Sequence, residues 1–172
     1  MSKLIGSVLI IAAATLLGFR IAARYADRTK QLRQFVTALK VLETEIHYAA
    51  TPLPQALQRI GRLVPKPVAA FFQSAADKLR DGRGIRASEA WQEALLANKA
   101  HLALKEADCE VLLNFGQTLG VSDRQDQIKH IHLAIAHLSA EENNARDEQQ
   151  RNEKMWKYLG ALMGLTVVIL LY

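Results

Sequence analysis

The sequence has little of what marks most enzymes and most secreted domains. Its 172 residues include one cysteine, so no intramolecular disulfide can form. Cys109 has no CxxC partner and falls inside a helical pattern, which favours a small buried residue over a nucleophile. The chain has no phosphate-binding glycine loop, no dinucleotide-binding fingerprint and no nucleophile motif. We therefore expect no enzymatic activity, no catalytic residues and no cofactor.

The potential metal ligands stand at unsuitable spacings. His130, His132 and His137 are two, five and seven residues apart, whereas side chains that share one ion on a helix stand three or four apart. Neighbouring carboxylates diverge on a helix, so we expect them to be solvated. These pairs are Glu43 with Glu45, Asp108 with Glu110, and Glu141 with Glu142. The sequence therefore predicts no metal site.

Proline, glycine and aromatic residues are also scarce. The chain holds four prolines, nine glycines and 6% aromatic residues, yet half of it is hydrophobic. Alanine and leucine are plentiful, and the alternation typical of strands is missing between the two ends. The fold class we predict is all-α, an antiparallel helical bundle between two terminal transmembrane helices.

Charge is missing from both ends of the chain. The segment from Leu4 to Phe19 is uncharged, and a helix counted through Ala23 is about 30 Å long, enough to span a bilayer. The last fifteen residues are uncharged but reach only about 22 Å, so Met155 and Trp156 would have to extend that span. We predict transmembrane helices at residues 1–23 and 158–172, around a bundle of residues 24–157. Small residues that could let the two spans pack closely are Gly18, Gly160 and Gly164.

The charges themselves indicate the topology. Every acidic residue, and every base except Lys3, lies between the two apolar ends, which by the positive-inside rule places the bundle in the cytoplasm. Arg20, Arg24 and Arg28 follow the first apolar run at four-residue steps, as juxtamembrane bases do. A net charge of +5 could also indicate nucleic-acid binding, but no aromatic residues interleave with these bases. We therefore expect a membrane lipid partner and no nucleic acid.

A cleaved secretory signal peptide is the alternative for the first segment. Lys3 supplies a basic start, and Ala22 and Ala23 could form a cleavage site. The chain would then be an exported helical adaptor with a C-terminal membrane tether. Arg20 and Arg24 on the far side of the run count against export.

Prolines divide the first half of the bundle, and a helical hairpin dominates the second. Thr51-Pro52 and Pro65-Lys66-Pro67 predict helix boundaries. Between Cys109 and Leu138, an apolar stripe containing Val111 predicts one helix that ends at a glycine cap, and a stripe of isoleucines predicts a second. The second helix can run unbroken toward the C-terminus. We assign the close packing, the cap and the capping box of this turn to Gly116, Gly120, Ser122, Asp123 and Gln125.

Basic side chains suggest a surface for a partner. Arg59, Arg62 and Lys66 share one face of the proline-bounded helix, and Arg83 and Arg86 make a glycine-containing loop basic. A solvated face is the plain interpretation of such charges. The functional hypothesis is a docking surface for an acidic cytoplasmic protein.

The hairpin also carries a family resemblance, which extends to both sides. The residues that carry it are Glu110, Leu112, Phe115-Gly116, Leu119-Gly120, Asp123-Arg124, Gln127, Lys129-His130-Ile131, Leu133-Ala134 and His137-Leu138 in the hairpin, Gly18-Phe19, Tyr25, Arg28, Gln31, Arg33, Leu42-Glu43, Glu45-Ile46, Tyr48 and Thr51-Pro52-Leu53 before it, and Asn152-Glu153-Lys154-Met155 and Leu159-Gly160 after it. In these positions the chain resembles the stage III sporulation protein AB family of endospore-forming bacteria.

The resemblance implies a role that the residues alone do not. It implies a part in the multiprotein channel between mother cell and forespore, in the mother-cell membrane, with the central domain in the cytoplasm. The implied partners are the secretion-type ATPase called stage III sporulation protein AA and other channel components. The family's soluble domain is similar to the cytoplasmic domains of the inner-membrane platform protein of type II secretion and type IV pilus systems, so we expect a platform that couples an ATPase to further proteins.

Overall fold

The chain is all-helical, as predicted. The computed structural model describes residues 2–49, 51–81, 84–120 and 123–171, with side chains described from Ala23 to Asn152 within those ranges and at Arg20 and Met155. The described residues form helices without any strand. In chain order the elements are α1 (Ser2–Thr44), the π-helical turn η1 (Glu45–Ala49), α2 (Leu53–Leu63), α3 (Val68–Arg80), α4 (Ala87–Asn98), the 3-10 turn η2 (Lys99–His101), α5 (Glu106–Thr118) and α6 (Arg124–Leu171).

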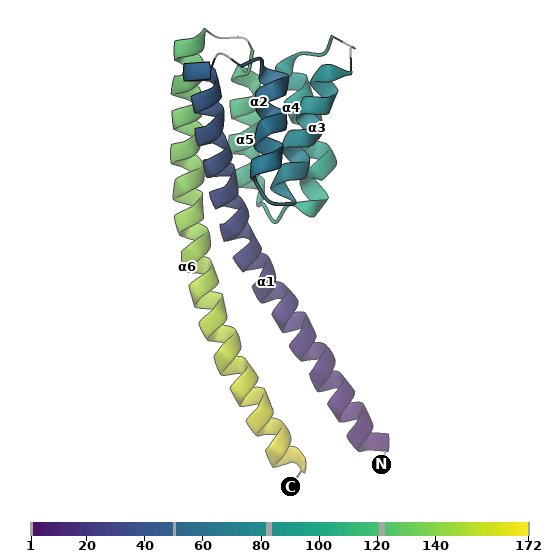
Figure 1. Ribbon diagram of the computed structural model, residues 1–172. Helices are drawn as coiled ribbons and strands as arrows, with labels where there is room; N and C mark the ends of the chain where they lie inside the picture. Colours follow the sequence, from purple (N-terminus) through teal and green to yellow (C-terminus); the bar gives the residue numbers. More distant parts are fainter. Residues whose placement is uncertain (1, 50, 82–83, 121–122, 172) are drawn as a thin grey trace.

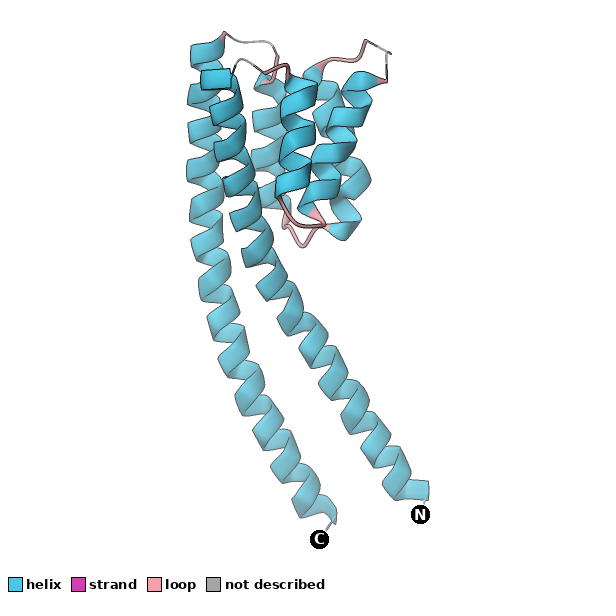
Figure 2. Cartoon of the chain, viewed as in Figure 1, coloured by secondary structure: helices cyan, strands magenta, loops and turns pink. Residues whose placement is uncertain are grey.

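Two long helices frame the molecule. Figure 1 shows α1 and α6 side by side, with the shorter helices α2 to α5 packed against one part of them. Beyond this bundle the two long helices continue together, so that both termini lie at the same end of the molecule. The loops of the bundle gather at its two ends, one set facing the termini and the other facing away (Figure 2).

Each long helix carries one apolar end of the chain into the bundle without a break. Neither α1 nor α6 contains proline, which would interrupt the backbone hydrogen bonds of a helix interior. The prediction that the last bundle helix runs on into the C-terminal segment is confirmed, and the first apolar segment is likewise continuous with the first bundle helix. Among the described residues, no helix combines the length and the apolar character needed to cross a bilayer.

The prolines set the boundaries of α2. The long first helix widens into the π-helical turn η1 before Pro52, and α2 has a proline in its first turn, where the missing N–H leaves no helical bond unmade. The helix ends at Leu63, two residues before Pro65. Both predicted boundaries are confirmed.

Aromatic side chains make the centre of the bundle. Phe71 and Trp91 meet edge to face with ring centroids 4.7 Å apart, and Trp91 meets Phe115 in the same way at 5.3 Å. The indole Nε1 of Trp91 donates a hydrogen bond of 2.8 Å to the Leu112 carbonyl, which satisfies the polar atom of this buried ring. The predicted apolar stripe is confirmed at Phe115 and Leu119, but Leu112 is fully buried where Val111 is only half-buried.

The turn between α5 and α6 follows the prediction in part. Gly120 has a φ of +77°, the left-handed conformation that a glycine cap provides. The cap of α6 is Asp123 and not Ser122, because α6 begins at Arg124 and Asp123 Oδ1 accepts a 2.8 Å bond from the Asp126 N–H. Ser122 lies outside the described residues, and Gln125 is exposed in the first turn of α6.

Gly116 packs directly against Trp91, which confirms the predicted close approach. A Cβ placed on Gly116 would overlap the indole, lying 2.9 Å from both Cγ and Nε1. We expect Gly116→Ala to lower the free energy of unfolding by about 1–3 kcal/mol, the usual cost of overpacking a core. Chemical denaturation followed by circular dichroism measures this. The matched control is Asn114→Ala, an exposed position on the same helix that should change stability by less than about 0.5 kcal/mol; similar losses in the two variants would contradict the packing argument.

Candidate functional site

A buried guanidinium joins three helices at the point where the long helices leave the bundle. Arg28 of α1 is 3% exposed. Its Nε and Nη2 each donate a 2.8 Å hydrogen bond to one oxygen of Asp108, a two-pronged pairing with α5. Nη2 also donates to Glu141 at 2.7 Å, and Nη1 donates to Glu148 at 3.2 Å, both on α6. Four of the five N–H donors of a guanidinium are thus used.

Asp108 is held in place by its own helix. It stands in the first turn of α5, where its Oδ2 accepts a 2.8 Å hydrogen bond from the backbone N–H of Lys105. This bond satisfies one of the free amides at the helix N-terminus, and the positive end of the helix dipole favours the carboxylate. Asp108 therefore enters the ion pair with Arg28 already oriented.

Lys105 extends the group of charges outward. Its Nζ donates to both oxygens of Glu148, at 2.6 and 2.8 Å. We call Arg28, Lys105, Asp108, Glu141 and Glu148 the Arg28 cluster. The hydrogen bond from Lys105 lowers the pKa of Glu148, and the hydrogen bond to Asp108 raises the pKa of Arg28. Both directions favour the charged forms of Glu148 and Arg28.

Two further polar pairs join α1 to α6 along the seam beyond this cluster. Arg33 Nη2 lies 2.8 Å from Glu142 Oε1, and His132 Nε2 shares a 2.8 Å hydrogen bond with Glu43 Oε1. The side chains of Arg33 and His132 are both more than half exposed. Exposed pairs of this kind add little stability, but they are consistent with one register of α1 against α6.

The sequence prediction for two of the carboxylates was wrong, because Asp108 and Glu45 are buried, not solvated. Arg28, which follows the first apolar run, is buried as well. Glu45 accepts hydrogen bonds from Arg59 and Thr51, at 2.8 and 2.7 Å. The partners of Arg28 stand 80 to 120 residues away in the chain, so no local spacing indicated them.

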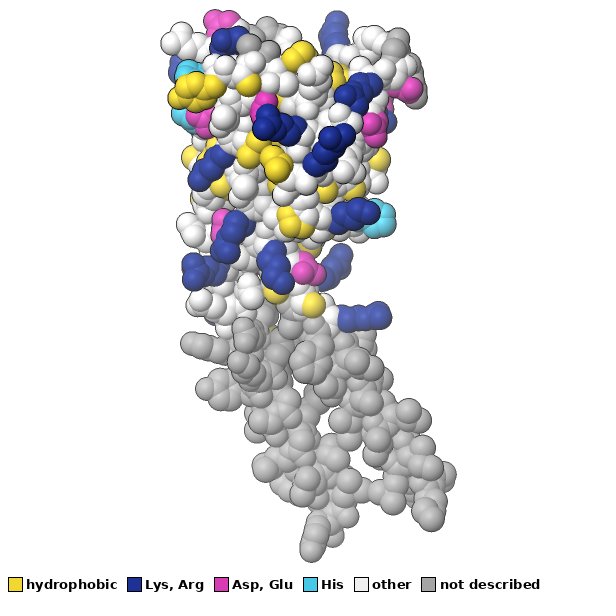
Figure 3. All heavy atoms as spheres, viewed as in Figure 1, with side chains coloured by type: hydrophobic (Ala, Val, Ile, Leu, Met, Phe, Trp, Pro, Cys, Tyr) yellow, Lys and Arg dark blue, Asp and Glu magenta, His cyan; other side chains and the backbone are white. Residues whose placement is uncertain are grey.

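The predicted docking residues do not form one surface. Arg59 and Arg62 are exposed on α2, beside Leu63, a leucine that is 61% exposed. Lys66 lies in the connection after α2, at the end of the bundle that faces the termini, whereas Arg86 lies at the start of α4, at the opposite end. Figure 3 shows many basic and few acidic side chains over the visible face. Arg83 lies outside the described residues, and at Gly18, Gly160 and Gly164 the structure describes only the helical backbone, so their predicted packing stays a prediction.

The remaining candidate side chains lie apart. His132 pairs with Glu43, and the described residues include no group of three or more potential ligands that could hold a metal ion. Cys109 is 2% exposed, and burial raises the pKa of its thiol, which keeps it neutral. The burial confirms the prediction of a small buried residue at this position.

These features define a class of protein: an all-helical bundle carried on two long helices and fastened to them by buried charges. Comparison with known proteins gives the family. The family model of stage III sporulation protein AB matches residues 3–172. The chain is 44% identical over 171 residues to stage III sporulation protein AB of Bacillus subtilis strain 168, covering 99% of both chains.

A solved structure agrees with this comparison. Stage III sporulation protein AB has a structure that matches with a TM-score of 0.69 and 42% identity, over 73% of this chain and 98% of that one. The chain belongs to the stage III sporulation protein AB family, and its role is in sporulation.

The Arg28 cluster should dominate the effect of charge removal on stability. Arg28→Met leaves Asp108 buried without its partner, so we expect the free energy of unfolding to fall by about 3–5 kcal/mol. Arg33→Met is the matched control on the same helix, and with a side chain 61% exposed it should cost less than about 1 kcal/mol. Denaturant unfolding of both variants tests this, and equal losses would show that Arg28 is not the central contact.

Proposed function

We propose that this chain is a non-enzymatic membrane platform of the sporulation-specific, secretion-like channel between mother cell and forespore. In this proposal the apolar ends of α1 and α6 lie in the mother-cell membrane and the bundle lies in the cytoplasm. The bundle is presented to a secretion-type ATPase of the stage III sporulation protein AA kind. Family membership supports the sporulation role, and the family resemblance supplies the platform role.

The observation that carries the proposal is the continuity of the two long helices. Residues 2–44 and 124–171 are each one helix, so the bundle and both apolar ends form connected parts of the same rigid elements. The Arg28 cluster fastens both helices to α5 at the point of exit. A displacement of the bundle would therefore move the terminal segments, which is what a coupling platform requires.

The surface of α2 is the best candidate for the ATPase contact. Arg62 is exposed and has no ion-pair partner among the described residues, so its charge is free for an acidic partner. Leu63 beside it exposes apolar surface, and burying that surface against a partner would stabilise the complex. Arg59 is partly neutralised by Glu45, which makes Arg62 the more informative residue to change.

A topology experiment tests the cytoplasmic placement. Gln92→Cys introduces a thiol at an exposed position of α4, and the buried native Cys109 should give little background. We expect a membrane-impermeant maleimide to leave this thiol unmodified in intact cells and to modify it after the membrane is opened. Modification in intact cells would contradict the placement, and would favour an exported bundle instead.

Charge reversal tests the docking surface. We expect Arg62→Glu in the full chain to weaken binding of the purified ATPase by at least about tenfold, because a favourable charge contact becomes repulsive. Raising the ionic strength should weaken ATPase binding by the unchanged chain toward the affinity of the Arg62→Glu variant. Lys129→Glu, an equal charge change at an exposed position of α6, is the control. Unchanged affinity of the Arg62 variant would exclude this surface.

A further inference from the structure

Two large leucines stand out on the surface of the bundle. Leu63 of α2 is 61% exposed, and Leu96 of α4 is 60% exposed. Covering either side chain with a partner would remove apolar surface from water and so stabilise an assembly. The two leucines do not cover each other within one chain, because α3 packs between α2 and α4. Leu63 also lies on the side of α2 opposite Gly61, which contacts Gln73 of α3.

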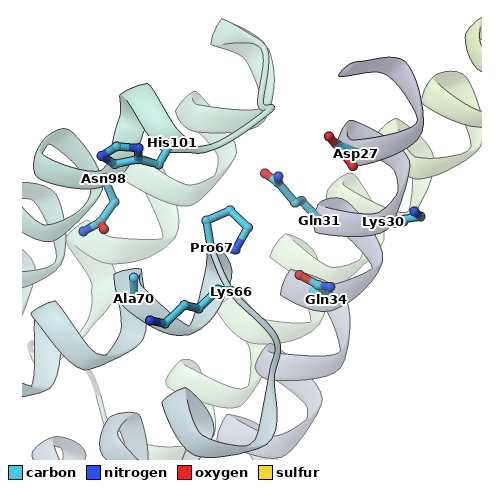
Figure 4. A pocket seen from close by; sticks show the side chains of 9 residues that line it. All are labelled: Asp27, Lys30, Gln31, Gln34, Lys66, Pro67, Ala70, Asn98 and His101. Carbon is cyan, nitrogen blue, oxygen red and sulfur yellow. The ribbon is translucent and has the colours of Figure 1, made fainter. Parts of the chain in front are cut away.

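Both leucines stand at the same level of the bundle. The helices α2 and α4 run in the same direction, toward the end that faces the termini, and Leu63 is the last residue of α2 while Leu96 is the third from last of α4. Lys66 follows α2 and Asn98 ends α4, and both line one pocket at that end (Figure 4). Copies anchored in one membrane by the same two helices share one height and one orientation. Leu63 of one copy can therefore meet Leu96 of the next.

The charges around the two leucines have opposite signs. Residues 53–67, which include α2, carry three bases and no acidic residue. These bases are Arg59, Arg62 and Lys66. The helix α4 carries two acidic residues, Glu89 and Glu93, and no base. The two surfaces are thus complementary in charge as well as in apolar character.

The spacing along the helices brings opposite charges together. With Leu63 of one copy level with Leu96 of its neighbour, Arg62 stands one residue and Glu93 three residues before its leucine, which separates the two by about 3 Å along parallel helices. Arg62 has no ion-pair partner among the described residues. Glu93 Oε2 accepts a 2.6 Å bond from Lys78 Nζ, but the Glu93 side chain is still 55% exposed. A carboxylate accepts several hydrogen bonds, so Glu93 can take a further donor.

We propose that α2 of one copy docks on α4 of a second copy of this chain, with Leu63 against Leu96 and Arg62 beside Glu93. The two surfaces differ, so the contact is head-to-tail and leaves each copy one surface for a further neighbour. The inference rests on the proposed function, because anchoring in the membrane brings the two surfaces to one level. The neighbouring copy and the ATPase use the same surface of α2, so the binding of one excludes the other there.

Disulfide crosslinking of the full chain in lipid vesicles tests the contact. One variant carries Leu63→Cys and another carries Leu96→Cys, both at exposed positions, and the buried native Cys109 should give little background. We expect a mild oxidant to join the two variants into dimers when they are mixed in one vesicle, and each variant alone to give only background. A chain with both substitutions should form a ladder of larger oligomers. Leu63→Cys mixed with Leu133→Cys, a similarly exposed position on α6, is the control and should give no dimer.

Charge reversal separates the contact from chance encounters in the membrane. Arg62→Glu, added to the Leu63→Cys copy, should lower the dimer yield at least about fivefold, because like charges then stand side by side. Lys129→Glu, the same charge change at an exposed position of α6, should leave the yield unchanged. Excess purified ATPase should also lower the yield, because it covers Arg62.

Each contrary outcome identifies what has failed. Background yields from the mixed variants, in vesicles where the ATPase still binds through Arg62, would overturn the second copy and leave the platform proposal standing. Dimer yields from either variant alone that equal those of the mixture would overturn the head-to-tail contact. Bound ATPase that leaves the yield unchanged would overturn the exclusion of one partner by the other. Efficient mixed dimers, with an ATPase affinity that Arg62→Glu does not change, would support the second copy and overturn the ATPase surface.

Discussion

The burial of the Arg28 guanidinium is the constraint on which the rest of the structure depends. A buried charge is costly unless its partners surround it, and here the partners come from α5 and α6. Apolar side chains at the same place could hold the helices together in several registers. A guanidinium that forms two parallel hydrogen bonds with Asp108 permits only one register. The cluster thus fixes how far α1 and α6 extend past each other where they leave the bundle.

The helices of the bundle are held by two kinds of contact, an aromatic core among α1, α3, α4 and α5, and aliphatic and charged contacts at α6. Phe71, Phe72 and Phe115 contact Trp91, and Phe35 contacts Phe71 and Phe72, so α1, α3, α4 and α5 share one aromatic core. The buried residues of α6 are small or aliphatic, and its other contacts with α1 include ion pairs. The helix that carries the C-terminal segment is therefore positioned by charge as well as by packing.

The sequence predicted what depends on neighbouring residues and missed what depends on distant ones. Proline and glycine set the ends of α2 and the turn at Gly120, because they restrict or free the backbone where they stand. The pairing of Arg28 with Asp108 spans 80 residues, and a charged side chain read alone is expected to be solvated. The signal that could have found it was the first-turn position of Asp108, which offers a carboxylate a favourable buried place.

The distribution of ion pairs along α1 bears on how a platform could transmit movement. Glu45, just past the end of α1, is bonded to Arg59 of α2, and Arg28 is bonded to α5 and α6 at the other end of the bundle. Between them Leu32 and Leu39 are fully buried, so α1 cannot slide against the core without breaking contacts at several levels. In the proposed platform, a force on the exposed side of α2 would be shared with α1 through Glu45 and would leave the bundle at Arg28. Because Arg28 is also bonded to α6, that force would act on both terminal helices together.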